Sequence, residues 1–459
     1  MTTESSLDWS KVSGVLGDRG IILIGRPKDE FRSLARVIEK NLGKSLHIIA
    51  NEHSWTGDAD RGSVALGYTS PTGIFHALHS VLTDPPPAVV AQLAGFDPRR
   101  RALVISDSNV VAPAFDGRRV LDSRSQELAR LEYPGAVTEV WRRAGLVTTP
   151  TREVLAPFND LSQACADIDM GYGVLCFGDR RLPVQEALES VRVVRDPVGA
   201  GQASAWLHLT SERAVVQPML PGVPVATSGM VIGERVVTLR PQEEGLVFDR
   251  SSGALWHASC STLALSGQDE ETLRRTAIQV GAVLREHHSF QGAFSVGGWL
   301  RRGAFTPSRL TTRTTRAHRH AIGAGIGASW SVVNALAVGR VLQEADIEGT
   351  GFRAHAALRE RRSVSMGLST HANPGRRVVG KWLVVKPDGR VCESRDRTPS
   401  CLLWLSTQDG GIITGLGLEE IFRGARHADR LAELLSLATS WWPGAGLHGV
   451  SPVCSGQSY

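Results

Sequence analysis

Two adjacent acidic residues, Glu243 and Glu244, are the part of this sequence whose types and spacing most directly suggest chemistry. Paired carboxylates can hold different pKa values and divide the work of a general acid and a general base. Neighbouring residues of a strand point to opposite faces. The alternative is therefore a structural pair, with one carboxylate facing solvent and the other neutralised by an arginine. Both interpretations stay open at this stage.

A second candidate pair is His257 and Cys260, because a cysteine beside a histidine can act as a nucleophile. A spacing of three in a strand puts the two side chains on opposite faces, which disfavours a direct contact. His318 and His320 could share a strand face, but no third metal ligand accompanies them. The six cysteines form no C-x-x-C pair, so a zinc site is not expected.

The elements that would position these residues centre on a predicted β-hairpin at 290–313. Residues 293–299 are rich in strand formers, Arg301-Arg302-Gly303 supplies the turn, and residues 305–312 return. A hairpin of this length would place residues of its two strands opposite one another.

The segments before this hairpin are predicted to be a strand pair and a helix. Apolar residues recur at helical spacing over 269–285, after a start signal at Ser266. A strand at 236–240 precedes two further strands, 245–248 and 254–258, which a Ser-Ser-Gly turn joins. Glu243 and Glu244 therefore lie beside the start of this strand pair.

This order of strands, helix and hairpin resembles the second half of an ATP-grasp core, most closely in the peptide and amino-acid ligases of natural-product pathways. In that family the hairpin reads roughly G-x-F-x-V-D-G, a turn, and P-x-E-x-N-x-R, and its Asp, Glu and Asn hold magnesium on the nucleotide phosphates. Here the three ligand positions are occupied by Gly297, Arg309 and Thr311, and only the final arginine remains, as Arg313. The resemblance implies that Arg313, with Glu243 and Glu244 after Arg-Pro, belongs to the catalytic region.

The resemblance also implies where a nucleotide would be held. Segment 191–195 resembles the strand with the second phosphate-binding lysine, here Arg195, and Gly199 and Gly201 resemble the glycine-rich flap. The alternative for these glycines is an ordinary turn. The first phosphate-binding lysine is replaced by Tyr133.

Residues 214–222 resemble the linker that holds adenine in the family. Gln217 occupies the position of a glutamate that takes the ribose hydroxyls, and an amide can both donate and accept hydrogen bonds. Met219 and Leu220 could face a base, with a plain role in the core as the alternative.

Lysine is absent between residues 45 and 380, so both phosphate-binding lysines are missing however the motifs are aligned. Magnesium prefers oxygen ligands, and an arginine at position 309 would put a cation where the metal should bind. ATP therefore stays open as a ligand, whereas Mg²⁺ is disfavoured. We expect Arg195, Arg309 and Arg313 to raise the local potential and to bind an anionic ligand; the alternative is that they point to solvent.

The chain of 459 residues carries a formal charge of +5 and is long enough for two or three domains. No basic stretch with interleaved aromatic residues indicates nucleic-acid binding, and no apolar run reaches membrane-spanning length. With a polar start and scattered cysteines, a cytoplasmic location is expected. We predict an α+β protein in three parts: an α/β N-terminal domain (1–115) resembling the pre-ATP-grasp domain, a degenerate ATP-grasp core of two α+β lobes (116–325), and a C-terminal α+β extension (326–459).

Three functions follow from the resemblance. The first is a degenerate ligase-like protein of peptide natural-product biosynthesis that binds an anionic peptidyl or aminoacyl substrate without using Mg·ATP in the family manner. The second is an active ATP-dependent carboxylate–amine ligase with a nucleotide site rebuilt around arginine. The third is a non-catalytic partner of an active ligase. A small-molecule or peptide substrate, and either a partner ligase or a second copy of the chain, are the expected partners.

Overall fold

The structure is a computed structural model of the chain. It describes residues 9–25, 80–106, 111–179, 191–249, 265–315 and 330–342, with shorter pieces between 35 and 50, at 64–65, between 253 and 262, at 318, and between 365 and 452. The side chains of His257 and Cys260, and all of His320, lie outside the described residues. In the described part, no helix combines the length and apolarity needed to cross a membrane.

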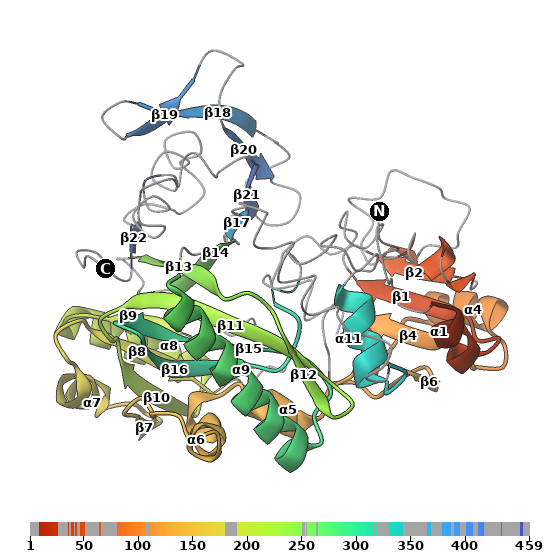
Figure 1. The fold of residues 1–459 in the computed structure, drawn as a ribbon, viewed down its shortest axis with the longest axis horizontal. Helices are drawn as coiled ribbons and strands as arrows, with labels where there is room; N and C mark the ends of the chain where they lie inside the picture. The colour runs from red at the N-terminus through yellow and green to blue at the C-terminus, as the bar shows by residue number, and fades with distance from the viewer. Residues whose placement is uncertain are drawn as a thin grey trace.

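The N-terminal sheet has four parallel strands in the order β3-β2-β1-β4 (Figure 1). Its inner strand β1 is an apolar run in which Ile21 to Ile24 are all buried, as expected for a parallel strand covered on both faces. The bounds are β1 (Ile21–Gly25), β2 (Leu46–Ala50), β3 (Val64–Ala65) and β4 (Leu103–Ser106), with helices α1 (Trp9–Leu16) and α4 (Pro87–Phe96).

A short connecting region leads from this sheet into the rest of the molecule. It contains a two-stranded ribbon and two helices, of which α6 begins with Pro134 in its first turn and is followed by Gly145 at φ 69°. The bounds are β5 (Ala114–Phe115), β6 (Arg118–Arg119), α5 (Gln126–Arg130) and α6 (Pro134–Arg143).

A small lobe follows, built on a four-stranded sheet in the order β7-β10-β8-β9 with neighbouring strands antiparallel. Helices α7 and α8 pack on this sheet and share one buried cluster with it. The bounds are β7 (Arg152–Leu155), α7 (Leu161–Ile168), β8 (Val174–Gly178), β9 (Val191–Val194), α8 (Pro197–Thr210) and β10 (Arg213–Pro218).

The prediction of a flap at Gly199 and Gly201 is wrong, because both glycines lie in the first turns of α8. The Asp196 side chain accepts a hydrogen bond from the Gly199 amide at 2.7 Å, and Pro197 occupies the first helical position. An aspartate cap followed by proline is a strong helix start, and it outweighs the two glycines.

The large lobe contains the predicted hairpin, formed by β15 (Gly292–Arg301) and β16 (Ala304–Thr311). Arg302 and Gly303 make the turn with φ values of 47° and 79°. The predicted helix before it is α9 (Gly267–His288), which starts where the Ser266 hydroxyl accepts the Asp269 amide at 3.1 Å. Helix α9 packs on β11, β12, β15 and β16.

The hairpin is the edge of a twelve-stranded sheet in the order β16-β15-β11-β13-β14-β17-β21-β20-β18-β19, with β12 and β22 paired to β11 and β13. The predicted pair of strands around the Ser-Ser-Gly turn is β13 and β14. The bounds are β11 (Val223–Ile232), β12 (Arg235–Thr238), β13 (Gln242–Asp249), β14 (Leu255–Thr262), β17 (Ser365–Leu368), β18 (Val379–Val385), β19 (Val391–Glu393), β20 (Cys401–Ser406), β21 (Ile412–Leu416) and β22 (Val450–Pro452).

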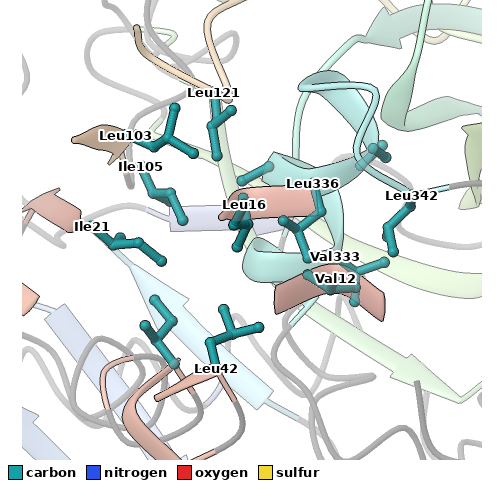
Figure 2. Close-up of a cluster of buried hydrophobic side chains, with 14 of the residues drawn as sticks. Val12, Leu16, Ile21, Leu42, Leu103, Ile105, Leu121, Val333, Leu336 and Leu342 are labelled. Carbon is teal, nitrogen blue, oxygen red and sulfur yellow. The ribbon is translucent and has the colours of Figure 1, made fainter. Parts of the chain in front are cut away.

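Helix α11 (Trp330–Val338) lies against the N-terminal sheet although it follows the hairpin in sequence (Figure 1). Figure 2 shows Val333 and Leu336 in one buried cluster with Ile21, Leu103 and residues of α1. Met230 and Ala293 of the large sheet belong to the same cluster. The N-terminal sheet and the large lobe therefore share a core, while the boundaries at 115/116 and 325/326 stay predictions.

Candidate functional site

The candidate site is the cleft between the small-lobe sheet and the large sheet, where the resemblance places a nucleotide. Apolar side chains from both sheets meet directly in this cleft and form one buried cluster: Leu175, Phe177, Val191, Val193, Met219, Leu246, Phe248, Leu255 and Trp299. The gap enclosed beside Trp299 measures about 10 Å³, roughly the space of one water molecule. The described walls of the cleft are therefore packed against each other.

Hydrogen bonds between described residues also join the lobes across this cleft. The Val193 amide of β9 donates to the Gly253 carbonyl, in the turn before β14, at 2.7 Å. The Ser308 hydroxyl of β16 donates to Oε1 of Gln217 on β10 at 2.9 Å, and both side chains are buried. The polar group predicted to take a ribose hydroxyl is thus engaged by a side chain of the opposite lobe.

The other two residues predicted to face a base belong to the cleft packing. Met219 has no exposed surface and is part of the apolar cluster, and Leu220 packs at its edge. The Met219 amide donates to the Gly173 carbonyl at 2.9 Å, which ties the linker to the loop before β8. These contacts fit the alternative of a plain core role.

Arg309, at the position of a metal-binding glutamate in the family, faces Gly297 across the hairpin. An ideal Cβ at Gly297 would lie 2.7 Å from three atoms of the Arg309 guanidinium, so the arginine occupies the space that a side chain at 297 would need. The guanidinium Nη2 donates to Oε2 of Glu244 on β13. Arg309 and Gly297 are therefore fitted to each other, and the charge of the guanidinium is neutralised by Glu244 of β13.

Glu243 and Glu244 are both buried, with exposed fractions of 5% and 4%. The alternative of a structural pair is right about an arginine partner for Glu244. It is wrong about a solvent-facing partner, because Glu243 is buried as well. Thr311, at the third ligand position, is also buried and lies opposite Ser295 in the hairpin.

Arg313 lies beyond the end of β16 and forms a cluster that sequence reasoning missed. Its Nε lies 3.3 Å from Oε1 of Glu132, and Nη1 of Arg124 donates to the same oxygen at 2.5 Å. The Thr312 amide adds a third hydrogen bond to that oxygen at 3.0 Å. Burial, followed by attraction to Glu132 and repulsion from Arg313, sets the pKa of Arg124, and the net effect lowers it.

Arg195 is separate from both groups. Its guanidinium carbon lies 4.8 Å from the centre of the Phe248 ring, a cation–π contact across the cleft. The three predicted anion-binding arginines thus contact three different partners: Phe248, Glu244 and Glu132. Their joint role as an anion site stays a prediction.

No protein-family model matches this chain, and no characterised protein sequence matches it. Solved structures do match. The carboxyaminoimidazole ribonucleotide synthase of Aspergillus clavatus complexed with ATP is 11% identical, with 92% of this chain and 99% of that chain covered and a TM-score of 0.54. The biotin carboxylase of Campylobacter jejuni is 12% identical, with 96% and 94% covered and a TM-score of 0.53. The L-amino acid ligase of Bacillus licheniformis is 13% identical, with 90% and 98% covered and a TM-score of 0.50.

The chain shares the α+β ATP-grasp fold of these structures. The expected fold class is therefore confirmed. At identities of 11–13%, the similarity establishes the fold and not the reaction.

The described side chains of the cleft do not fit a magnesium–nucleotide complex. Magnesium needs oxygen ligands in near-octahedral geometry, whereas Gly297 offers none and Arg309 brings a positive charge to the same place. Among the described residues, no three His, Cys, Asp or Glu side chains are grouped so that they could hold a metal. Met219 and its apolar neighbours form a buried cluster between the two sheets.

Proposed function

We propose that this protein is a ligase-like member of the ATP-grasp fold that does not use Mg·ATP in the family manner and acts by binding a carboxylate ligand. The observation that carries the proposal is the Arg309 guanidinium, which lies over Gly297 and pairs with Glu244. The guanidinium occupies the place where the dication would bind, and the Glu244 carboxylate is already paired with it.

The proposal also includes the class of ligand and the partner of this protein. The hairpin resembles those of peptide and amino-acid ligases, so an aminoacyl or peptidyl carboxylate in a cytoplasmic peptide pathway is the ligand class that we favour. Arginine is suited to such a ligand because its planar fork matches a carboxylate in bidentate geometry. An active ligase, or a second copy of this chain, would supply the chemistry that this cleft lacks.

Calorimetry and phosphate release test the proposal directly. We expect no magnesium-dependent ATP binding and phosphate release at the background rate with every amino-acid pair offered. Two variants probe the arginines of such a site: Arg195→Ala removes the exposed arginine at the end of β9, and Arg313→Ala removes the remaining motif arginine.

Magnesium-dependent phosphate release that both variants abolish, while circular dichroism shows them folded, would establish the alternative of an active ligase with an arginine-rebuilt nucleotide site. Release that persists equally in both variants would indicate a contaminating ATPase and would leave the proposal standing.

A further inference from the structure

A second cavity lies outside the cleft, where the connecting region, the large lobe and α11 meet. It measures about 160 Å³ and is lined by residues 122–125 and Leu128, by the turn 289–291 after α9, by Thr312, and by the C-terminal end of α11. None of these residues lines the gap beside Trp299. The cavity is therefore separate from the candidate nucleotide cleft.

The wall of this cavity carries excess positive charge. Arg124 lines it with only 8% of its side chain exposed, and its buried Nε has no hydrogen-bond partner among the residues that the structure describes. The carboxylate of Glu132 lies behind Arg124, and it contacts both Arg124 and Arg313. Among the described charged groups at and behind the cavity, the three guanidinium groups of Arg124, Arg313 and Arg340 stand against the two carboxylates of Glu132 and Asp122, an excess of one positive charge. Electrostatic interactions are strong at such a partly buried site.

A second arginine lies at the exposed side of the cavity. Arg340 follows α11 in a left-handed conformation with φ 56°, and no ion pair involves it within the described residues. Leu128, Phe290 and Val338 contribute apolar surface. The lining thus combines a buried arginine, an exposed arginine and an apolar wall.

Size and charge narrow the ligand class. A cavity of about 150 Å³ holds a molecule of the size of benzene, so this one suits a small organic acid. A phosphate dianion is disfavoured, because Asp122 lines the cavity and Glu132 lies directly behind Arg124. A monocarboxylate needs only one positive charge and can place its carbon chain on the apolar wall.

We propose that this cavity binds a small organic monocarboxylate, held by Arg124 and covered by Arg340. The inference deepens the ligand-binding half of the proposed function, because it names the place and the chemistry of the carboxylate site. It does not depend on whether the cleft handles ATP. The cavity would enclose the entire amino or organic acid, and its carboxylate would bind Arg124 in bidentate geometry.

Thermal shift and calorimetry with propionate, pyruvate, L-alanine, benzoate and inorganic phosphate, at constant ionic strength, test this site. We expect saturable stabilisation by at least one monocarboxylate and weaker or no stabilisation by phosphate. Arg340→Ala should weaken the binding of that acid about tenfold, with Arg340→Lys in between. Val338→Phe, which fills the cavity, should abolish it. Arg302→Ala, at the exposed hairpin turn, should leave binding unchanged.

No saturable shift with any of the carboxylates would overturn the proposal, and so would equal affinity in the wild type, Arg340→Ala and Val338→Phe. Tighter binding of phosphate than of every carboxylate would overturn the ligand class. Carboxylate binding together with magnesium-dependent ATP turnover would refute the loss of ATP chemistry and leave this site intact. The two proposals therefore fail separately.

Discussion

Arg309 and Gly297 face each other across the hairpin and are fitted to each other. The guanidinium of Arg309 fills the space above Gly297. Its charge is neutralised by Glu244 of β13, which is separated from β16 by β15 and β11. Restoring an acidic side chain at position 297 alone would place it against Arg309 and would not recreate a metal site. The local chemistry is that of a buried ion pair.

The Arg309–Glu244 pair predicts a strong coupling in stability. The side chains are 16% and 5% exposed, so Arg309→Ala leaves Glu244 buried without this partner and should lower the free energy of unfolding by about 2–4 kcal/mol. The Arg309→Ala/Glu244→Ala double variant should recover part of that loss. Urea unfolding of the four proteins in the cycle measures the coupling.

Arg301→Ala, at the exposed end of β15, is the matched control and should change stability by less than about 0.5 kcal/mol. Additive effects of the two single substitutions would contradict a direct interaction between Arg309 and Glu244.

At the scale of elements, the two sheets that form the nucleotide cleft of the fold are here the two sides of a packed core. Strands β8 and β9 contribute Leu175, Phe177 and Val193, and the large sheet contributes Phe248 and Trp299. The lobes are also joined by the hydrogen bond between Gln217 and Ser308. From these contacts we expect the small lobe to stay packed against the large sheet.

Trp299→Ala should destabilise the protein by about 3–5 kcal/mol, because it removes a large side chain that is 3% exposed and leaves a cavity between the lobes. Trp206→Ala on α8 is the matched control: that ring is half-buried, with Arg192 at 3.6 Å from its centre, and its loss should cost about 1 kcal/mol. Chemical denaturation gives both values. Equal costs would show that the cleft is not packed in solution.

We expect the stability of the protein to depend on pH through His47, which lies on β2 of the N-terminal sheet. Burial, and then the positive charge of Arg118, hold the pKa of His47 below its ordinary value of 6.5. The folded state therefore resists protonation while the unfolded state accepts it, so stability should be lost as the pH falls below about 6.5. In His47→Leu this contribution disappears. The melting temperature of the variant minus that of the wild type should increase as the pH is lowered from 8 to 5.5. A difference that stays constant would contradict a lowered pKa of His47.

At the scale of the whole molecule, α11 connects parts that the sequence separates. It lies more than 200 residues after the N-terminal strands, yet Val333 and Leu336 share a cluster with Ile21 and with Met230 of the large sheet. A core that spans the N-terminal sheet and the large lobe couples their stability.

Leu336→Ala should therefore lower stability by about 2–5 kcal/mol and shift a single unfolding transition as a whole. Leu209→Ala, in which the side chain is 78% exposed on α8, should have almost no effect. Scanning calorimetry distinguishes the outcomes, because an N-terminal part that melted separately in Leu336→Ala would show that α11 does not couple the two parts.

The sequence alone determined the features that depend on local pattern and residue identity. Apolar periodicity and turn residues predicted the hairpin and α9. The resemblance predicted that Gly297 and Arg309 stand at ligand positions, and the residues themselves show that lysine is absent from 45 to 380. The helix at α8 was also encoded locally, by Asp196 and Pro197, but the glycines after them were taken for a flap.

Only the tertiary structure decided what these substitutions mean. The contact of Arg313 with Glu132 joins residues 181 positions apart, and that of Ser308 with Gln217 joins residues 91 positions apart. No periodicity in the chain specifies such pairs, because they arise when two lobes close on each other. Whether an arginine in a degenerate motif faces a nucleotide, solvent or a carboxylate of its own chain depends on that closure, and here Arg309 meets Glu244.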